Sequence, residues 1–197
     1  MSDPIETMMA AIRYEEAVYG SFPFWDRGYA LLAHSPGCRP EWLTAFERAC
    51  QHFGEPPVGA DASGALFALR IRGGPWMIVG VGATGTDDRG RPGALAFHGL
   101  FVTGRDLRRT SIGPFALAGA IRLAWGPETV LTGGSWQVEE PSDACDDDAN
   151  ALPARIAHAL RDGRRVAIES GTPIEPLARQ VWQLAGERVR RRASVAT

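Results

Sequence analysis

The stretch GALAFHGLFVTGRDLRR, at residues 93–109, places one histidine, His98, inside an apolar run. Imidazole is the commonest general base in enzymes, and it needs a nucleophile and an orienting acid within hydrogen-bond reach. Ser35 and Cys38 are candidate nucleophiles, but no nucleophile-elbow or helix motif brings them to the histidine. The neighbours of His98 along its strand are apolar or glycine, which favours a structural histidine in a core over a catalytic one.

The segment GVGATG, at residues 80–85, matches the glycine spacing of a dinucleotide-binding fingerprint. In that fold the last glycine leads into a helix whose N-terminus holds the pyrophosphate. Here TDDRGRPG follows, which cannot begin a helix, and the next strand lies too close for a crossover helix. The sequence therefore predicts a glycine-rich strand end and a hairpin, with no cofactor.

Two further clusters raise the question of a metal site. The segment DACDDDAN, at residues 143–150, lacks both the alternating ligands and the glycine that a calcium loop requires. We expect it to be a solvated loop before the next helix, since acids favour helix N-termini. The three cysteines, Cys38, Cys50 and Cys145, form no CxxC pair and predict neither a disulfide framework nor a zinc site.

Two segments are candidate binding surfaces. The segment SFPFWDR, at residues 21–27, carries more aromatic side chains than a simple connection between strands needs. The segment ERVRRR, at residues 187–192, is a basic run that also suits the C-terminus of a helix. The side chains expected to form these surfaces are those of Phe22, Phe24, Trp25, Arg190, Arg191 and Arg192.

The elements that must position these residues follow from periodicity and from glycine and proline punctuation. Strands are predicted at 12–20, 28–35, 66–72, 76–82, 94–103, 164–170 and 193–197, with a shorter one near 135–138. Helices are predicted at 39–54, 113–127, 151–163 and 173–192. This order predicts a single α+β domain over residues 1–197, with a mixed, mainly antiparallel sheet and about four helices. Residues 139–150 are the candidate subdomain seam.

The strand over residues 94–103 is apolar on both parities, which predicts a central position in the sheet. The chain end, residues 193–197, is predicted to be an ordered strand because Val195 and Thr197 are β-branched and share one parity.

Composition excludes several classes of protein. The chain has 197 residues, of which 45% are hydrophobic and 22% charged, and its net charge is −2. That charge creates no general attraction to nucleic acid or to a membrane surface. No apolar run is long enough to cross a bilayer, and the acidic N-terminus is unlike a signal peptide. We therefore expect a cytoplasmic protein that binds neither membranes nor nucleic acid.

Four stretches resemble the N-terminal domain of the GTPase-associated proteins of bacterial NTP-dependent conflict, or defence, systems. The first is EAVYGSFPFWDRGYALLAHSPG, with its YG strand and its closing SPG. The second is AFHGLFV, a central strand with an embedded histidine. The third is the helix–turn–strand ALPARIAHALRDGRRVAI, and the fourth is the basic end RVRRRASVAT. Together they span nearly the whole chain.

The resemblance implies a non-enzymatic adaptor that binds a protein partner, for which a GTPase encoded nearby is the candidate. It brings no catalytic residues and no cofactor with it. Two other hypotheses stay open at this point. One is a small hydrolase that uses His98 with Cys38 or Ser35, and the other is a nucleotide or small-ligand sensor built on Phe22, Phe24 and Trp25.

Overall fold

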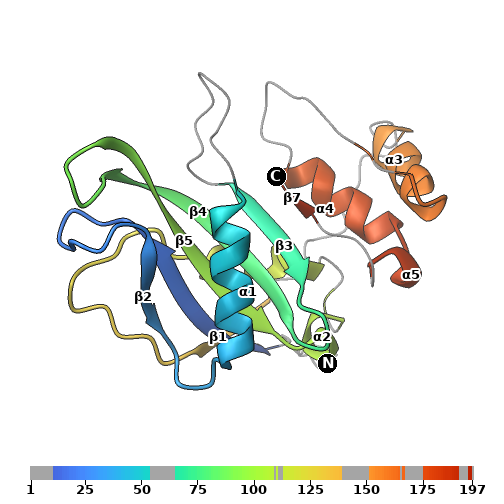
Figure 1. Ribbon diagram of the computed structural model, residues 1–197. Helices are drawn as coiled ribbons and strands as arrows, with labels where there is room; N and C mark the ends of the chain where they lie inside the picture. The colour runs from blue at the N-terminus through green and yellow to red at the C-terminus, as the bar shows by residue number, and fades with distance from the viewer. Residues whose placement is uncertain are drawn as a thin grey trace, which may run out of the picture.

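A computed structural model shows seven strands joined in antiparallel pairs (Figure 1). It describes residues 11–53, 65–108, 110, 113–138, 151–164, 166, 175–190 and 195–196. The strands are β1 (Ala11–Gly20), β2 (Ala30–His34), β3 (Leu66–Arg70), β4 (Trp76–Thr86), β5 (Pro92–Val102), β6 (Gly134–Gln137) and β7 (Val195–Ala196). The helices are α1 (Pro40–Gln51), α2 (Gly104–Leu107), the 3₁₀ helix η1 (Gly113–Ala120), α3 (Ala151–Arg161), α4 (Glu175–Leu184) and α5 (Glu187–Arg190).

The strand that carries His98 lies in the middle of the sheet, as its apolar residues predicted. The order is β2-β1-β5-β4-β3-β7, and β6 pairs with the first half of β1. His98 stands opposite Val18 of β1 and Gly80 of β4. Every strand pairing in the described part of the chain is antiparallel, and the predicted α+β class is confirmed.

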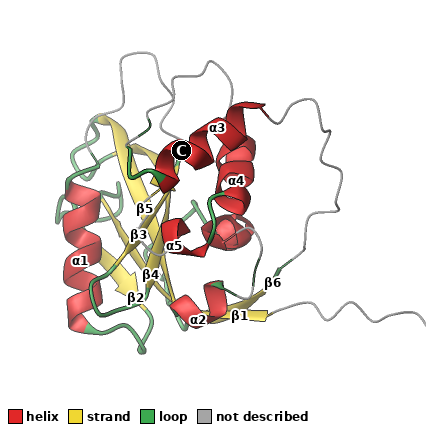
Figure 2. Cartoon of the chain, turned by 90° about the vertical axis from the view of Figure 1, so that its right-hand side faces the viewer, coloured by secondary structure: helices red, strands yellow, loops and turns green. Residues whose placement is uncertain are grey.

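Helices cover both faces of the sheet. Figure 2 shows α1 on one face and α3, α4 and α5 on the other. On the α1 face, Phe46 packs against Phe101 and Tyr19 with its ring edge-on. Gly99 of β5 allows this approach, since a Cβ atom there would lie 2.7 Å from the Phe46 ring. The remaining core lies between the opposite face of the sheet and η1 with α4.

The predicted helix over residues 113–127 is wrong. The chain forms a 3₁₀ helix only as far as Ala120, and residues 121–126 then run without helical structure along the sheet. This course depends on the glycines of GVGATG. A Cβ atom on Gly80 would collide with Ile121, and one on Gly82 would lie 3.0 Å from the Leu123 side chain. Both glycines therefore have a packing role, and the segment 121–126 covers the sheet in place of a helix.

The C-terminal prediction is partly wrong and partly confirmed. The single helix expected over residues 173–192 is two helices, because Gly186 between α4 and α5 adopts a φ of +77°, which breaks a right-handed helix. The expected final strand exists: Val195 and Ala196 pair with β3 opposite Ala68 and Phe67.

Several predictions fall mainly or wholly outside the described residues. These are the strand over 164–170, the seam and acidic loop over 139–150, and the positions of Cys145, Arg191 and Arg192. Within the described ranges, the helices are too short or too polar to cross a lipid bilayer.

Candidate functional site

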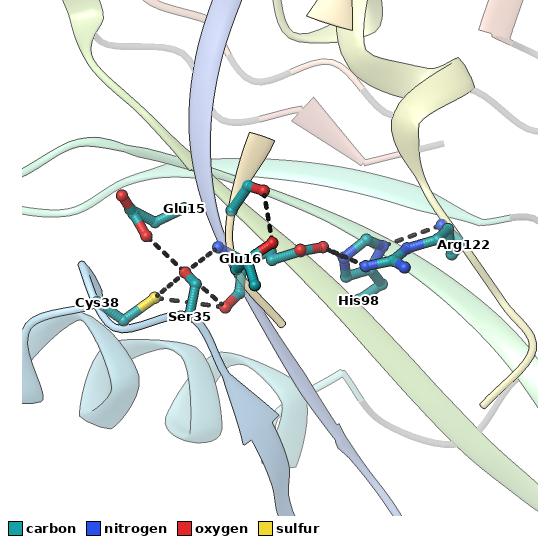
Figure 3. A network of polar contacts seen from close by, with 8 residues as sticks. Glu15, Glu16, Ser35, Cys38, His98 and Arg122 are labelled. Carbon is teal, nitrogen blue, oxygen red and sulfur yellow. Dashed lines mark hydrogen bonds and ion pairs between the residues drawn. The ribbon is translucent and has the colours of Figure 1, made fainter. Parts of the chain in front are cut away.

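A buried polar network surrounds His98 (Figure 3). The imidazole has no exposed surface, and its Nε2 lies 3.0 Å from Oε2 of Glu16, which is itself buried. The guanidinium of Arg122 donates to the same carboxylate oxygen over 2.6 Å. The backbone N–H of Arg122 donates to Nδ1 of His98 over 2.9 Å. The network thus joins β1, β5 and the segment 121–126.

This geometry defines the tautomer of His98. A backbone N–H can only donate, so Nδ1 must accept, and the ring hydrogen of the neutral imidazole lies on Nε2, where it donates to Glu16. Burial lowers the pKa of His98, and it outweighs the opposing effect of the Glu16 carboxylate. The imidazole is therefore neutral at neutral pH.

The Glu16 carboxylate is the charged member of the buried pair. Burial raises its pKa, but the hydrogen bonds from His98 and Arg122 outweigh burial and hold the pKa below its ordinary value. Glu16 is therefore ionised, and Arg122, whose side chain is 53% exposed, brings the compensating charge from the surface.

His98 has no nitrogen free for general-base chemistry. A base must accept a proton at an unoccupied lone pair, and the one lone pair of this tautomer already accepts the Arg122 N–H. The ring also packs edge-on against Trp125, with centroids 4.9 Å apart. His98 therefore fastens the segment 121–126 to the sheet, which is the structural role that its apolar neighbours favoured.

Ser35 and Cys38 form a second polar cluster at the end of β2. The Ser35 hydroxyl donates to Oε2 of Glu15 over 2.6 Å and accepts the backbone N–H of Glu16 over 2.9 Å. The Cys38 Sγ lies 3.6 Å from the Ser35 hydroxyl and donates to the Glu16 carbonyl over 3.4 Å. Burial raises the pKa of the Cys38 thiol, so the sulfur is protonated and a poor nucleophile at neutral pH.

The sheet separates this cluster from His98. Cys38 packs in the core on the α1 face with Phe97 and Phe101. Neighbouring side chains on a strand point to opposite faces, so His98 lies on the other face. Figure 3 shows the two clusters on either side of β1. The structure does not bring the candidate base together with either candidate nucleophile.

Glu16 and Arg122 are the residues that sequence reasoning missed. Glu16 lies in a strand that is buried from Glu16 to Gly20, and an acid in such a strand was the one available signal. Arg122 had none, because residues 113–127 were predicted to be a helix.

The aromatic loop at residues 21–29, between β1 and β2, is held in place at both ends. Asp88 accepts hydrogen bonds from the Ser21 hydroxyl and from the Gly28 N–H, each over 3.1 Å. Phe22 is buried and stacks on Phe24 and on Trp25. Phe24 remains 38% exposed, so the loop is partly closed over the core and partly open, whereas equal exposure of all three rings had been expected to mark a surface.

The loop also presents two other groups that suit recognition. Tyr29 is 48% exposed, and its hydroxyl accepts the Leu95 N–H over 2.9 Å. The Arg27 guanidinium lies 5.3 Å from the centre of the Trp25 ring, a cation–π distance. Tyrosine, tryptophan and arginine are the residue types that dominate the energetic centres of protein interfaces.

Arg190, the described member of the predicted basic surface, lies against the end of α4. Its Nε donates to the Trp182 carbonyl over 2.8 Å, and its Nη2 donates to the Gln183 carbonyl. These are carbonyls that a helix end leaves without intrahelical partners. Part of the guanidinium is therefore used in capping α4, and the rest faces a cavity.

Comparison with known proteins finds no match among family models, curated proteins or solved structures. The resemblance to the N-terminal domain of GTPase-associated proteins therefore stays a prediction, as do the partner and the bacterial defence context.

Proposed function

We propose that this chain is a non-enzymatic interaction domain that binds a protein partner through the aromatic loop. The observation that carries the proposal is the construction of that loop. Phe22 anchors it in the core, Asp88 closes it, and Phe24 with Tyr29 stay exposed. An anchored loop loses little conformational entropy on binding, which favours affinity.

The state of the candidate catalytic groups supports a role without chemistry. His98 is buried with its lone pair engaged, and the Cys38 thiol is protonated on the opposite face of the sheet. An acyl-transfer site would need a base and a nucleophile in mutual contact beside an open pocket. The small-hydrolase hypothesis has no such arrangement to support it.

The partner in this proposal is a GTPase encoded beside the chain, acting in a bacterial defence system. This part rests on the resemblance of four sequence stretches, two of which, AFHGLFV and EAVYGSFPFWDRGYALLAHSPG, include the central strand and the aromatic loop. A cytoplasmic setting belongs to the same proposal.

The test is co-purification and calorimetry of the full chain with that GTPase. We expect a stable complex that Phe24→Ala weakens about tenfold, because an exposed aromatic anchor contributes strongly to an interface. Val130→Ala is the matched control, since Val130 is an exposed apolar residue outside the loop. No complex with the wild-type chain, or equal losses in the two variants, would overturn the proposal. Labelling of Ser35 or Cys38 by an acylating active-site probe would instead favour the hydrolase.

A further inference from the structure

A cavity of about 300 Å³ opens where the end of β3, the start of β4, α2 and α5 meet. Three of its lining residues are arginines, one each from β3, the end of α2 and α5: Arg70, Arg108 and Arg190. Trp76, Gly104 and Thr110 also line it. None of the described residues that line the cavity is an aspartate or a glutamate.

The cavity is rich in hydrogen-bond donors. Trp76 is only 5% exposed, yet its indole N–H has no acceptor among the described residues. This Nε1 and the Nη1 of Arg108 lie within 3.8 Å and 3.5 Å of the place where Gly104 would carry a Cβ atom. A buried indole N–H usually has a partner. Here its nearest charged neighbour is another donor, so an acceptor must come from outside the chain.

Two features hold these donors in place before any ligand arrives. Arg190 is fixed by its hydrogen bonds to the Trp182 and Gln183 carbonyls. The Trp76 ring packs edge-on against Trp182, with centroids 5.7 Å apart. Both contacts tie the cavity to the end of α4. Donors that are already positioned bind an anion without the cost of ordering flexible side chains.

We propose that this cavity binds the phosphate group of a small ligand. Phosphate oxygens accept hydrogen bonds only, and arginine matches their geometry with a rigid fork of donors. A volume of about 300 Å³ lies at the lower end of small-molecule sites and suits a phosphomonoester of the size of a sugar phosphate or a nucleoside monophosphate. The apolar wall of Trp76 and Leu107 would contact the organic part.

The cavity is separate from the aromatic loop, so this inference does not rest on the proposed function. Trp76 begins β4, whereas Thr84, near the other end of β4, donates to the Ser21 carbonyl at the base of the loop. A strand of this length separates the two places by roughly 30 Å. Loss of one binding activity therefore leaves the other intact.

A nucleic acid is the less favoured ligand for these arginines. Its backbone would need a long basic track, but the cavity is compact and the net charge of the whole chain is −2. Binding of single-stranded RNA is accordingly an outcome of the test that would overturn the small-ligand proposal.

The experiment is isothermal titration calorimetry on the full chain at low ionic strength. The probes are inorganic phosphate, sugar phosphates, adenosine and guanosine monophosphate, and a short single-stranded RNA. We expect at least one phosphomonoester to bind more tightly than inorganic phosphate, and Arg108→Gln to weaken it about tenfold, since a hydrogen bond to a charged group is lost. Tighter binding of inorganic phosphate would instead identify the free ion as the ligand and would overturn the organic part of the proposal.

The matched control is Arg48→Gln, which removes an exposed arginine from α1 on the other face of the sheet. It changes the net charge equally, so we expect less than a twofold change in affinity. Equal losses in Arg108→Gln and Arg48→Gln would show attraction to overall charge only and would overturn the site. Absence of binding to every phosphate probe at millimolar concentration, with both variants folded, would overturn it as well.

Discussion

The His98 network and the arginine cavity both concentrate charged groups, but they differ in how the charges are balanced. In the network, the Glu16 carboxylate accepts from His98 and Arg122, and both nitrogens of the imidazole are engaged. In the cavity, three arginines and the Trp76 N–H converge, and no acid lies among the described lining residues. A polar cluster that satisfies itself serves the fold, whereas one that presents donors alone is suited to an external anion.

The largest effect that can test this comparison is the loss of the acid at the centre of the network. We expect Glu16→Ala to lower the free energy of unfolding by about 3 to 5 kcal/mol, because it leaves the Nε2–H of His98 buried without an acceptor. Denaturant unfolding followed by circular dichroism measures this. Glu41→Ala, at the exposed first turn of α1, is the control and should stay within about 0.5 kcal/mol.

The second effect is on the pH dependence of stability. The pKa of His98 is lowered in the folded chain, so the unfolded chain binds more protons than the folded one as the pH falls below about 6.5. Stability is therefore complete above that pH and is lost towards lower pH, and Glu16, whose pKa is also lowered, adds a further loss below the ordinary pKa of a glutamate.

We expect His98→Leu to flatten the slope of stability against pH between about pH 7 and 5, even though the variant is less stable. Urea unfolding at several pH values gives this slope. His52→Gln is the control, since His52 lies on the exposed side of α1, and it should keep the wild-type slope. An unchanged slope in His98→Leu would mean that the imidazole is not the group that senses acid.

A smaller effect is expected for Arg122, whose side chain is half exposed. Arg122→Gln should lower the free energy of unfolding by about 1 kcal/mol, because water screens its ion pair with Glu16. The backbone N–H that donates to His98 is retained in this variant. Arg164→Gln, which removes an exposed pair with Asp162, should change stability by less than about 0.5 kcal/mol. A loss as large as that of Glu16→Ala would place the stabilising charge on Arg122 instead.

The smallest effect on stability belongs to the cavity. Arg108 is exposed and has no acceptor among the described residues, so Arg108→Gln should leave the free energy of unfolding within about 0.5 kcal/mol of the wild-type value. Thermal unfolding without ligand measures this. A clear destabilisation would show that Arg108 supports the fold, and the contrast between the two regions would fail.

The sequence alone predicted the elements that depend on local patterns. The apolar strand at residues 94–103 was expected to be central, α1 to begin near Pro40, and the chain end to form a strand, and all three are confirmed. What failed depended on distant partners. The helical pattern of residues 113–127 was overruled because Gly80 and Gly82, more than thirty residues earlier, leave room for an extended segment.

The site residues divide in the same way. The structural role of His98 followed from its apolar neighbours along the strand. Its partners did not, because Glu16 and Arg122 are 82 and 24 residues away from it and meet it only through sheet pairing and the path of residues 121–126. The arginine cavity was foreshadowed only by Arg190, since Arg70 and Arg108 reach it from two other elements.

The central claim is that His98 is a neutral, fully engaged structural residue. The most direct test is a long-range ¹H–¹⁵N NMR spectrum of the histidine rings, recorded between about pH 5 and 8 with His98→Leu for assignment. We expect His98 to show the Nε2–H tautomer near neutral pH and to resist protonation at about 6.5, where an ordinary histidine titrates. An Nδ1–H tautomer, or an imidazolium at neutral pH, would contradict the account and return His98 to the list of candidate catalytic groups.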